Sequence, residues 1–272
     1  MFLSLIPLYY QLLSAYRPKA DISSTPQVNQ PPISTPVPTP TGSVLGMAVG
    51  GEGQVVTVAV LGDSMIDTLG TDLLTLKKSL ADYFPTKVFR LLNYGLGASN
   101  IESGLSRLTN SYQNHQQEIP SLISQKPDIV VIESFAYNNY GNTQTGIDKH
   151  KNLLNSIISK INQELPNTKI ILATAIAPNS IIYAKGVPNL NLSSLDRIER
   201  TKTIRLYQQN TIEFARSKNL PLAAASEYSL ENDSEGRIEY IDPIDRLHPS
   251  ALGAKLFADT LADTIHLNKL LE

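Results

Sequence analysis

Four short motifs along the chain carry side chains that could perform nucleophilic acyl transfer. They are Gly62-Asp63-Ser64, residues 93–99 (NYGLGAS), residues 135–139 (FAYNN) and residues 245–249 (DRLHP). Together they supply a serine hydroxyl, an imidazole, a carboxylate and turns rich in amide groups. A serine nucleophile needs a base, the base needs an orienting carboxylate, and the developing oxyanion needs hydrogen-bond donors. These residue types therefore indicate an acyl-transfer site assembled from distant parts of the chain.

The elements that must position these motifs alternate between strand and helix from residue 55 onward. Continuous apolar runs predict buried strands at residues 55–61, 88–93, 128–133, 169–175 and 220–225. Apolar side chains at helical spacing predict helices at residues 72–84, 100–108, 146–165, 194–218 and 249–266. This alternation predicts one α/β domain with a doubly wound parallel sheet.

Three of the four motifs directly follow predicted strands, and the fourth precedes the last predicted helix. In an open α/β sheet, ligands bind outside the carboxyl ends of the strands. We therefore expect the four motifs to converge at that edge of the sheet.

The order of these motifs resembles the pattern of the SGNH (GDSL) hydrolases. The resemblance covers roughly residues 55–267 and rests on all four motifs in order, since each one alone is weak. It implies a flavodoxin-like three-layer α/β/α sandwich with a parallel, five-stranded sheet. It also implies hydrolysis of esters or thioesters, and in some members acyl transfer. A Gly-x-Ser-x-Gly elbow is absent, which disfavours the α/β-hydrolase route to the same chemistry.

The resemblance implies a role for each matched residue. Ser64 would be the nucleophile, His248 the general base and Asp245 the carboxylate that orients the imidazole. The implied oxyanion hole consists of the backbone N–H of Ser64, the backbone N–H of Gly97 or Ala98, and the side chain of Asn138. Three further residues are expected to contact substrate: Asp63, Tyr137 and Asn139.

Two positions depart from the family's pattern. Ala98 stands where the family has its oxyanion glycine, and Gly97 precedes it, so either amide could complete the hole. Ala136 replaces the glycine of Gly-x-Asn, and Tyr137 follows it. A bulky tyrosine there predicts a short acyl pocket and an aromatic surface on which a sugar ring can pack.

Each candidate also has a plainer interpretation. Ser64 could simply cap the helix that follows it, and the role of residues 138–139 could be merely to shape a turn. Asp242, Asp245 and His248 would form an incomplete metal-ligand set, so we expect no metal. The segment 181–195 is either a lid, a substrate-binding loop or an ordinary surface excursion. The other histidines are expected to be solvated: His115, His150 and His266.

Composition excludes several classes of function. With 23 Lys plus Arg against 25 Asp plus Glu, the net charge is −2 and no basic surplus favours nucleic acid as a partner. The absence of cysteine excludes disulfides, thiolate nucleophiles and cysteine-based metal sites. No glycine-rich phosphate loop is present, and we expect no cofactor.

The first 50 residues differ in composition from the remainder. Residues 1–16 are apolar and uncharged and are followed by Arg17 and Lys19, so residues 1–20 are interpreted as a signal or membrane-anchor segment. A mis-assigned start or a surface helix are the alternatives. Residues 21–50 are rich in Pro, Ser and Thr and predict an extended linker, leaving residues 51–272 as the hydrolase domain. This organisation predicts an extracytoplasmic protein that is secreted or membrane-associated through residues 1–16.

The sequence therefore predicts a serine esterase that hydrolyses O-acyl groups, chiefly O-acetyl groups, of small-molecule or glycan esters. Alternatives with the same fold are a lysophospholipase, a thioesterase and a glycan O-acyltransferase. A non-catalytic binding module is the alternative from another class.

Overall fold

The structure is a computed structural model that describes residues 55–232 and 234–272. The predicted anchor segment 1–20 and the linker 21–50 lie outside the described residues, as do the first four residues of the predicted domain 51–272.

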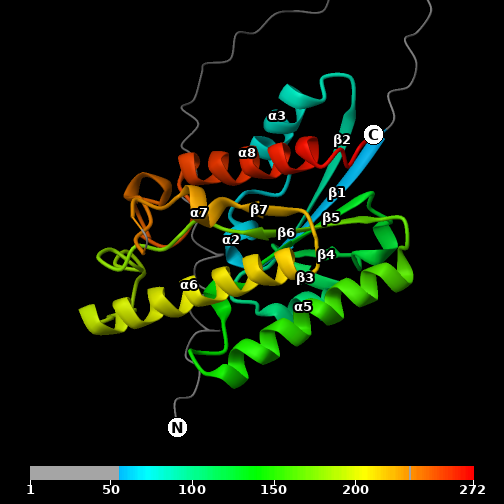
Figure 1. The fold of residues 1–272 in the computed structure, drawn as a ribbon. Helices are drawn as coiled ribbons and strands as arrows, with labels where there is room; N and C mark the ends of the chain where they lie inside the picture. Colours follow the sequence, from blue (N-terminus) through cyan, green and yellow to red (C-terminus); the bar gives the residue numbers. More distant parts are fainter. Residues whose placement is uncertain (1–54, 233) are drawn as a thin grey trace, which may run out of the picture. The chain divides into compact units, whose positions relative to one another are not determined.

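Five parallel strands form the central sheet, in the order β2-β1-β5-β6-β7 (Figure 1). The strands are β1 Val55–Gly62, β2 Val88–Gly95, β5 Ile129–Glu133, β6 Lys169–Thr174 and β7 Leu222–Ala224. β1 pairs with β2 on one side and with β5 on the other, so the winding reverses between β1 and β5. This is the flavodoxin-like order, in which the reversal point marks the ligand crevice.

Helices cover both faces of this sheet (Figure 1). One face carries α3 Leu74–Tyr83 and α8 Ala251–Leu267, and the other carries α4 Ile101–Arg107, α5 Gln144–Glu164 and α6 Ser194–Ser217. The predicted three-layer α/β/α sandwich with a five-stranded parallel sheet is confirmed. In the described part of the chain, no helix combines the length and the apolar character that a bilayer crossing needs.

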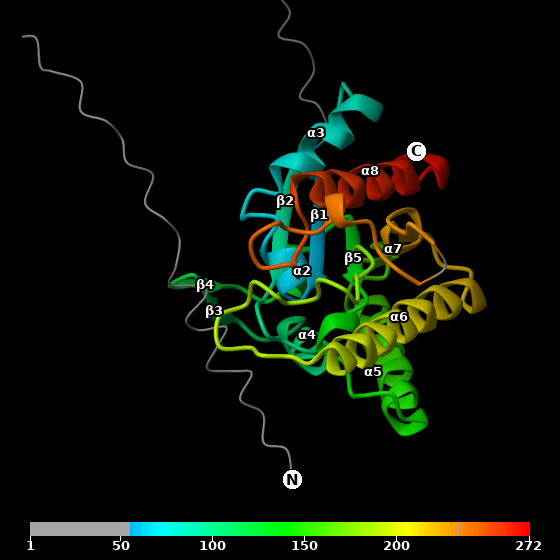
Figure 2. The same ribbon diagram turned by 90° about the vertical axis from the view of Figure 1, so that its left-hand side faces the viewer.

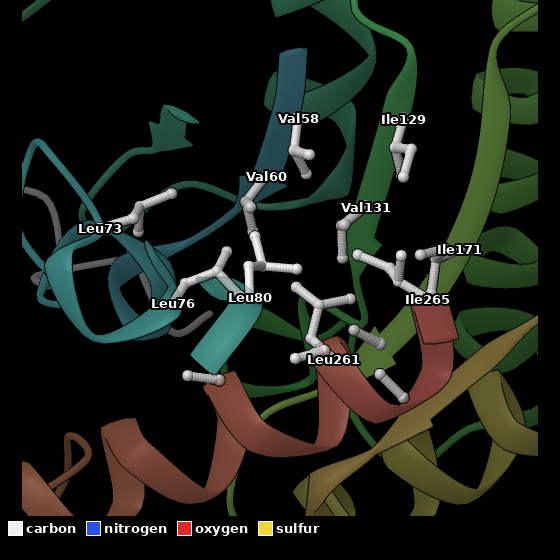
Figure 3. Close-up of a cluster of buried hydrophobic side chains, with 14 of the residues drawn as sticks. Val58, Val60, Leu73, Leu76, Leu80, Ile129, Val131, Ile171, Leu261 and Ile265 are labelled. Atoms are coloured by element: carbon white, nitrogen blue, oxygen red, sulfur yellow. The ribbon is translucent and has the colours of Figure 1, made fainter. Parts of the chain in front are cut away.

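The alternation of side chains along each strand explains why the strands are apolar throughout. Val58 and Val60 pack toward α3 and α8, whereas Ala59 and Leu61 pack toward α4, α5 and α6. Figure 3 shows strand residues of the first cluster, such as Val60, facing Leu261 of α8. Each fully buried large aliphatic side chain contributes about 1.5–3 kcal/mol through removal of apolar surface from water.

Local capping sets several helix ends. The Thr143 side chain accepts from the Gly146 N–H, so α5 begins two residues before the predicted start. Ser193 and Asp196 form a reciprocal capping box at the start of α6, where the prediction was correct. The Ser250 side chain caps α8, which therefore starts after the predicted Pro249.

Several short elements were not predicted because they are too short to show a period. They are α2 Ser64–Asp67, η1 Ile123–Gln125, η2 Ala136–Asn138, α7 Ala225–Tyr228, η3 Ile238–Tyr240 and the hairpin of β3 Tyr112–Asn114 with β4 Gln117–Ile119. The hairpin turn places His115 and Gln116 at φ of 47° and 63°. Such a turn ordinarily uses Asn or Gly, so the usual sequence signal is missing.

Candidate active site

Ser64 is the first residue of α2 and lies directly after β1, with a side chain that is almost fully buried. Two glycines allow α2 to lie this close to the strand ends. A Cβ on Gly62 would approach Ile66 Cγ1 to 2.3 Å, and one on Gly95 would approach Asp67 N to 2.2 Å. Figure 2 shows α2 in front of the sheet, between the two layers of helices. The Gly-Asp-Ser motif and the second glycine turn therefore form one packed unit.

The side chain of Asp63, the middle residue of the Gly-Asp-Ser motif, is fully buried. Its Oδ1 accepts from the Met65 N–H at 2.9 Å, and its Oδ2 accepts from Asn138 Nδ2 at 2.8 Å. Burial raises the Asp63 pKa, and these two hydrogen bonds and the charges of His248 and Arg107 act against that shift. We predicted that Asp63 contacts substrate; the structure instead directs its carboxylate toward α2 and Asn138.

Asp245 and His248 are joined within one turn. The Nδ1–H of His248 donates to Asp245 Oδ2 at 2.7 Å, while Asp245 Oδ1 accepts from the N–H groups of Leu247 and His248 at 2.8 and 3.0 Å. Burial alone would raise the Asp245 pKa, but the hydrogen bonds and charge of His248 outweigh it, so the pKa lies below its usual range. The carboxylate thus fixes the imidazole tautomer and leaves Nε2 as the basic nitrogen.

Apolar packing brings the neighbours of Ser64 and His248 together. Met65 and Ile241 belong to one buried cluster, and Ile241 forms an antiparallel bridge with Pro249, the residue after His248. In addition, the charge of His248 acts on the buried carboxyl of Asp63, which precedes Ser64. The first and fourth motifs therefore converge at the carboxyl edge of the sheet, as expected.

The turn after β2 is held against α2 by Asn93. Its Nδ2 donates to the carbonyls of Ile66 and Gly70 at 3.0 and 2.9 Å, and its Oδ1 accepts from the Gly95 N–H at 2.7 Å. The loop after β2 begins at Leu96, and its third residue, Ala98, has a φ of 55°. The second motif is therefore fixed to the first by side-chain to backbone hydrogen bonds.

The turn after β5 contains the other three predicted site residues. Asn138 points toward Asp63, as described above. Asn139 shapes the turn, since its Nδ2 donates to the Ala136 carbonyl at 2.8 Å and its Oδ1 accepts from the Gly141 N–H at 2.9 Å. Tyr137 is half-buried, and its hydroxyl donates to the Ile176 carbonyl at 3.0 Å. The ring thus packs against the cluster that holds Met65.

Three of these loops contain a residue other than glycine in the left-handed backbone region. Ala98, Phe135 and Arg246 have φ values of 55°, 53° and 61°. Each such residue costs of order 1–2 kcal/mol and persists only where the surrounding contacts determine it. Eleven described residues other than glycine have a positive φ, so this conformation is not confined to the loops that carry the motifs.

Two buried titratable residues near the third motif were not predicted as site residues, although a glutamate at the end of an apolar strand is itself unusual. Glu133 ends β5; burial raises its pKa to about 8, and the nearby Asp63 carboxyl adds to the shift. His150 of α5 was expected to be solvated, and this was wrong. It is buried, its Nε2–H donates to the Ser134 carbonyl at 2.7 Å, and Asn210 Nδ2 donates to its Nδ1 at 2.9 Å. Burial lowers its pKa to about 4, so it is a neutral structural residue. The other two histidines are exposed, as expected: His115 and His266.

Part of the segment 181–195 supports the loop that carries the fourth motif. The Ala184 N–H donates to the Arg246 carbonyl at 2.9 Å, and the Gly186 N–H donates to the Asp245 carbonyl at 3.3 Å. A Cβ on Gly186 would lie 1.6 Å from the Ile244 carbonyl oxygen, so only glycine fits there. The segment between β6 and α6 crosses the same side of the molecule as α2 (Figure 2).

No group of three His, Asp or Glu side chains within residues 55–232 and 234–272 is arranged to hold a metal ion. The arrangement described above relies on a hydroxyl, an imidazole, a carboxylate and amide groups.

Comparison with known proteins identifies a matching family and several solved structures of similar fold. The sequence model of the GDSL-like Lipase/Acylhydrolase family matches residues 60–256. No curated protein sequence matches the chain significantly. Among solved structures, a lipase/acylhydrolase from Enterococcus faecalis is 20% identical and covers 78% of this chain and 96% of its own, with a TM-score of 0.55. A catalytic mutant of an acetylxylan esterase from Geobacillus stearothermophilus is 17% identical, with coverages of 79% and 95% and a TM-score of 0.53. At these identities, the solved structures are evidence for the fold alone.

Proposed function

Since the chain belongs to the GDSL-like lipase/acylhydrolase family and is an ester hydrolase, we propose that Ser64, His248 and Asp245 form its catalytic triad. The observation that carries the proposal is the 2.7 Å hydrogen bond between His248 Nδ1 and Asp245 Oδ2, in a loop packed next to α2. The same carboxylate accepts two backbone N–H groups, so its position is fixed independently of the imidazole.

The chemistry follows from this arrangement. His248 Nε2 takes the proton of the Ser64 hydroxyl as Oγ attacks the ester carbonyl and forms a tetrahedral oxyanion. Collapse of this intermediate breaks the bond to the alcohol oxygen, which leaves with the proton from His248. A water molecule then attacks the acyl-Ser64 ester, gives its proton to His248 Nε2, and releases the carboxylic acid as Oγ regains a proton.

The oxyanion would be held by the N–H of Ser64, the N–H of Gly97 or Ala98, and Asn138. A primary amide has two N–H groups. Asp63 accepts one hydrogen bond from Asn138 Nδ2, which fixes the amide plane and leaves the second N–H for an oxyanion. Removal of a single such donor typically lowers the rate by about 10²–10³.

The packing around Ser64 favours a small acyl group on a polar alcohol. Met65, Ala175, Ile176 and Ile241 form a buried apolar cluster next to Ser64, and Tyr137 packs against it. A bulky tyrosine at this position shortens the space for an acyl chain, and its half-buried ring offers a face for a pyranose ring. We therefore propose acetyl esters of saccharides as substrates. A relative of the same fold is named as an acetylxylan esterase, which is compatible with this substrate class.

The test is kcat/KM for p-nitrophenyl esters from acetyl to dodecanoyl, together with release of acetate from acetylated xylooligosaccharides. We expect the highest value for the acetyl ester, because each added methylene contributes up to about 0.8 kcal/mol only where an apolar pocket receives it. Ser64→Ala is the matched control and should lower kcat by about 10⁴ or more while leaving the fold intact. A maximum at octanoyl or longer would identify a lipase or thioesterase instead, and transfer of acetyl to a glycan rather than to water would identify an acyltransferase. Retention of activity in Ser64→Ala within about tenfold of wild type would overturn the assignment of Ser64 as nucleophile. Absence of esterase activity in both proteins would leave only the binding-module interpretation.

A further inference from the structure

Arg107, the last residue of α4, is almost fully buried beneath the carboxyl ends of β1 and β2, with an exposed fraction of 2%. Its guanidinium lies over the ring of Tyr112, with the centroid 5.4 Å away, and near the ring of Phe135 at 5.9 Å. None of the ion pairs in the described ranges includes it. Burial of a cation without a direct carboxylate partner destabilises the folded state. The other contacts of Arg107 must therefore compensate for its lost hydration.

Those contacts join the two loops that flank the nucleophile. Nη2 donates to the Gly62 carbonyl at 3.0 Å and to Ser99 Oγ at 3.1 Å, and Nη1 donates to the Tyr94 carbonyl. Nε donates to the Ser103 carbonyl within α4 at 3.3 Å. One rigid fork of donors therefore connects the end of β1, the end of β2 and the turn that follows β2.

We propose that Arg107 is a positioning residue that holds the backbone N–H groups of residues 97–98 in place relative to Ser64. The inference rests on the proposed function, because it assigns Arg107 to the oxyanion hole of that site. Gly62 lies two residues before Ser64, and Ser99 directly follows Ala98. Ser99 Oγ also donates to the Leu96 carbonyl at 2.7 Å, so the hydroxyl is held from both sides.

Backbone strain and charge both support this role. Ala98 holds a left-handed conformation that needs external contacts to persist, and the Arg107–Ser99 hydrogen bond supplies one next to it. The buried positive charge of Arg107 also favours negative charge nearby, including the Asp63 carboxylate that orients Asn138.

The primary test compares Arg107→Met with Arg107→Lys, using p-nitrophenyl acetate hydrolysis and the inhibition constant of phenylboronic acid. Boronic acids form a tetrahedral adduct with a serine nucleophile and so report on the oxyanion hole. We expect Arg107→Met to lower kcat about 10²-fold, to change KM less than about threefold, and to weaken boronate binding in parallel. Arg107→Lys keeps the charge and should recover about tenfold of the lost kcat. Arg90→Met is the matched control, since Arg90 is exposed on β2 and bonds Gln125 Oε1, and it should match wild type.

Ser99→Ala keeps the test decisive if Arg107→Met does not fold. It removes only the hydroxyl between Arg107 and the turn, and we expect a kcat loss of about three- to tenfold with unchanged KM. If Arg107→Met folds and has the kcat of wild type, the inference is overturned. If Arg107→Met does not fold, a wild-type kcat in Ser99→Ala overturns it. A raised KM with unchanged kcat would also overturn it. An inactive wild-type enzyme, indistinguishable from Ser64→Ala, would instead remove the proposed function and with it the oxyanion that Arg107 is inferred to serve.

Discussion

Ala98 and Ala136 both stand where the resembling family has glycine, yet their backbones differ. Ala98 has a φ of 55°, whereas Ala136 begins the 3₁₀ turn η2 and is not among the residues with positive φ. Ala98→Gly should relieve about 1–2 kcal/mol of left-handed strain and lose about 0.4–1 kcal/mol through the more flexible unfolded chain. We therefore expect a net gain of about 0.5–1 kcal/mol in the free energy of unfolding, measured by urea denaturation.

Ala136→Gly is the control for this prediction at the same scale. No strain is relieved there, a buried methyl group is lost, and the unfolded chain gains freedom, so stability should fall by about 1 kcal/mol. Equal effects of the two substitutions would contradict the strain assigned to Ala98.

Glu133 predicts a pH dependence of stability. Its pKa is raised by burial from 4.5 to about 8, so between these values the folded state holds a proton that the unfolded chain releases. Its contribution is therefore fully present below about pH 4.5 and is lost as pH rises toward 8, with a slope of up to about 1.4 kcal/mol per pH unit. Glu133→Gln removes this titration. The free energy of unfolding of the variant, minus that of wild type, should rise from pH 5 to pH 8.

Asp63 also has a pKa raised by burial, and its charge acts on Glu133, so the difference between the two proteins reports the titration of this interacting pair. Glu118→Gln, at an exposed position of β4, should give a curve parallel to wild type. If the Glu133→Gln curve is parallel as well, the carboxyl is not protonated in the folded state at neutral pH.

At the scale of elements, the segment between β6 and α6 positions the general base. Gly186→Ala would place a methyl group against the Ile244 carbonyl, which must move and carry Asp245 with it. A displacement of about 1 Å in a catalytic group can cost about 10² in rate, so we expect kcat to fall by about 10–10² with KM little changed. Lys185→Ala, at the exposed neighbouring position, should leave kcat unchanged. If both variants match wild type in p-nitrophenyl acetate hydrolysis, the segment does not support the triad.

At the scale of the whole molecule, we propose that residues 1–50 serve location rather than catalysis. The chain shortened to residues 51–272 should fold and keep the kcat/KM of the full chain, because a Pro-rich linker contributes no core. In cells, the full chain should fractionate with the membrane or outside the cell, and the shortened chain should not. Lost folding or activity on shortening would show that residues 1–50 pack on the domain, and a cytosolic full chain would reject the export proposal.

The sequence by itself determined the strands, the long helices and the order of the four motifs. Strand β1 was predicted at residues 55–61 and ends at Gly62, and α6 was predicted to within one residue. These features are local, because apolar period and capping residues act over a few positions. The family resemblance then assigned roles to Ser64, Asp245 and His248 from motif order alone.

Only the tertiary structure decided what lies beneath those motifs. Arg107 meets the Gly62 carbonyl 45 positions away, His150 meets Asn210 60 positions away, and Asp63 turns inward to Asn138, 75 positions along the chain. In sequence, a charged or polar residue on a helix appears equally suited to solvent. Its burial and its partners depend on contacts between distant segments, which no local pattern encodes, and the pKa values of Glu133 and His150 follow from that burial.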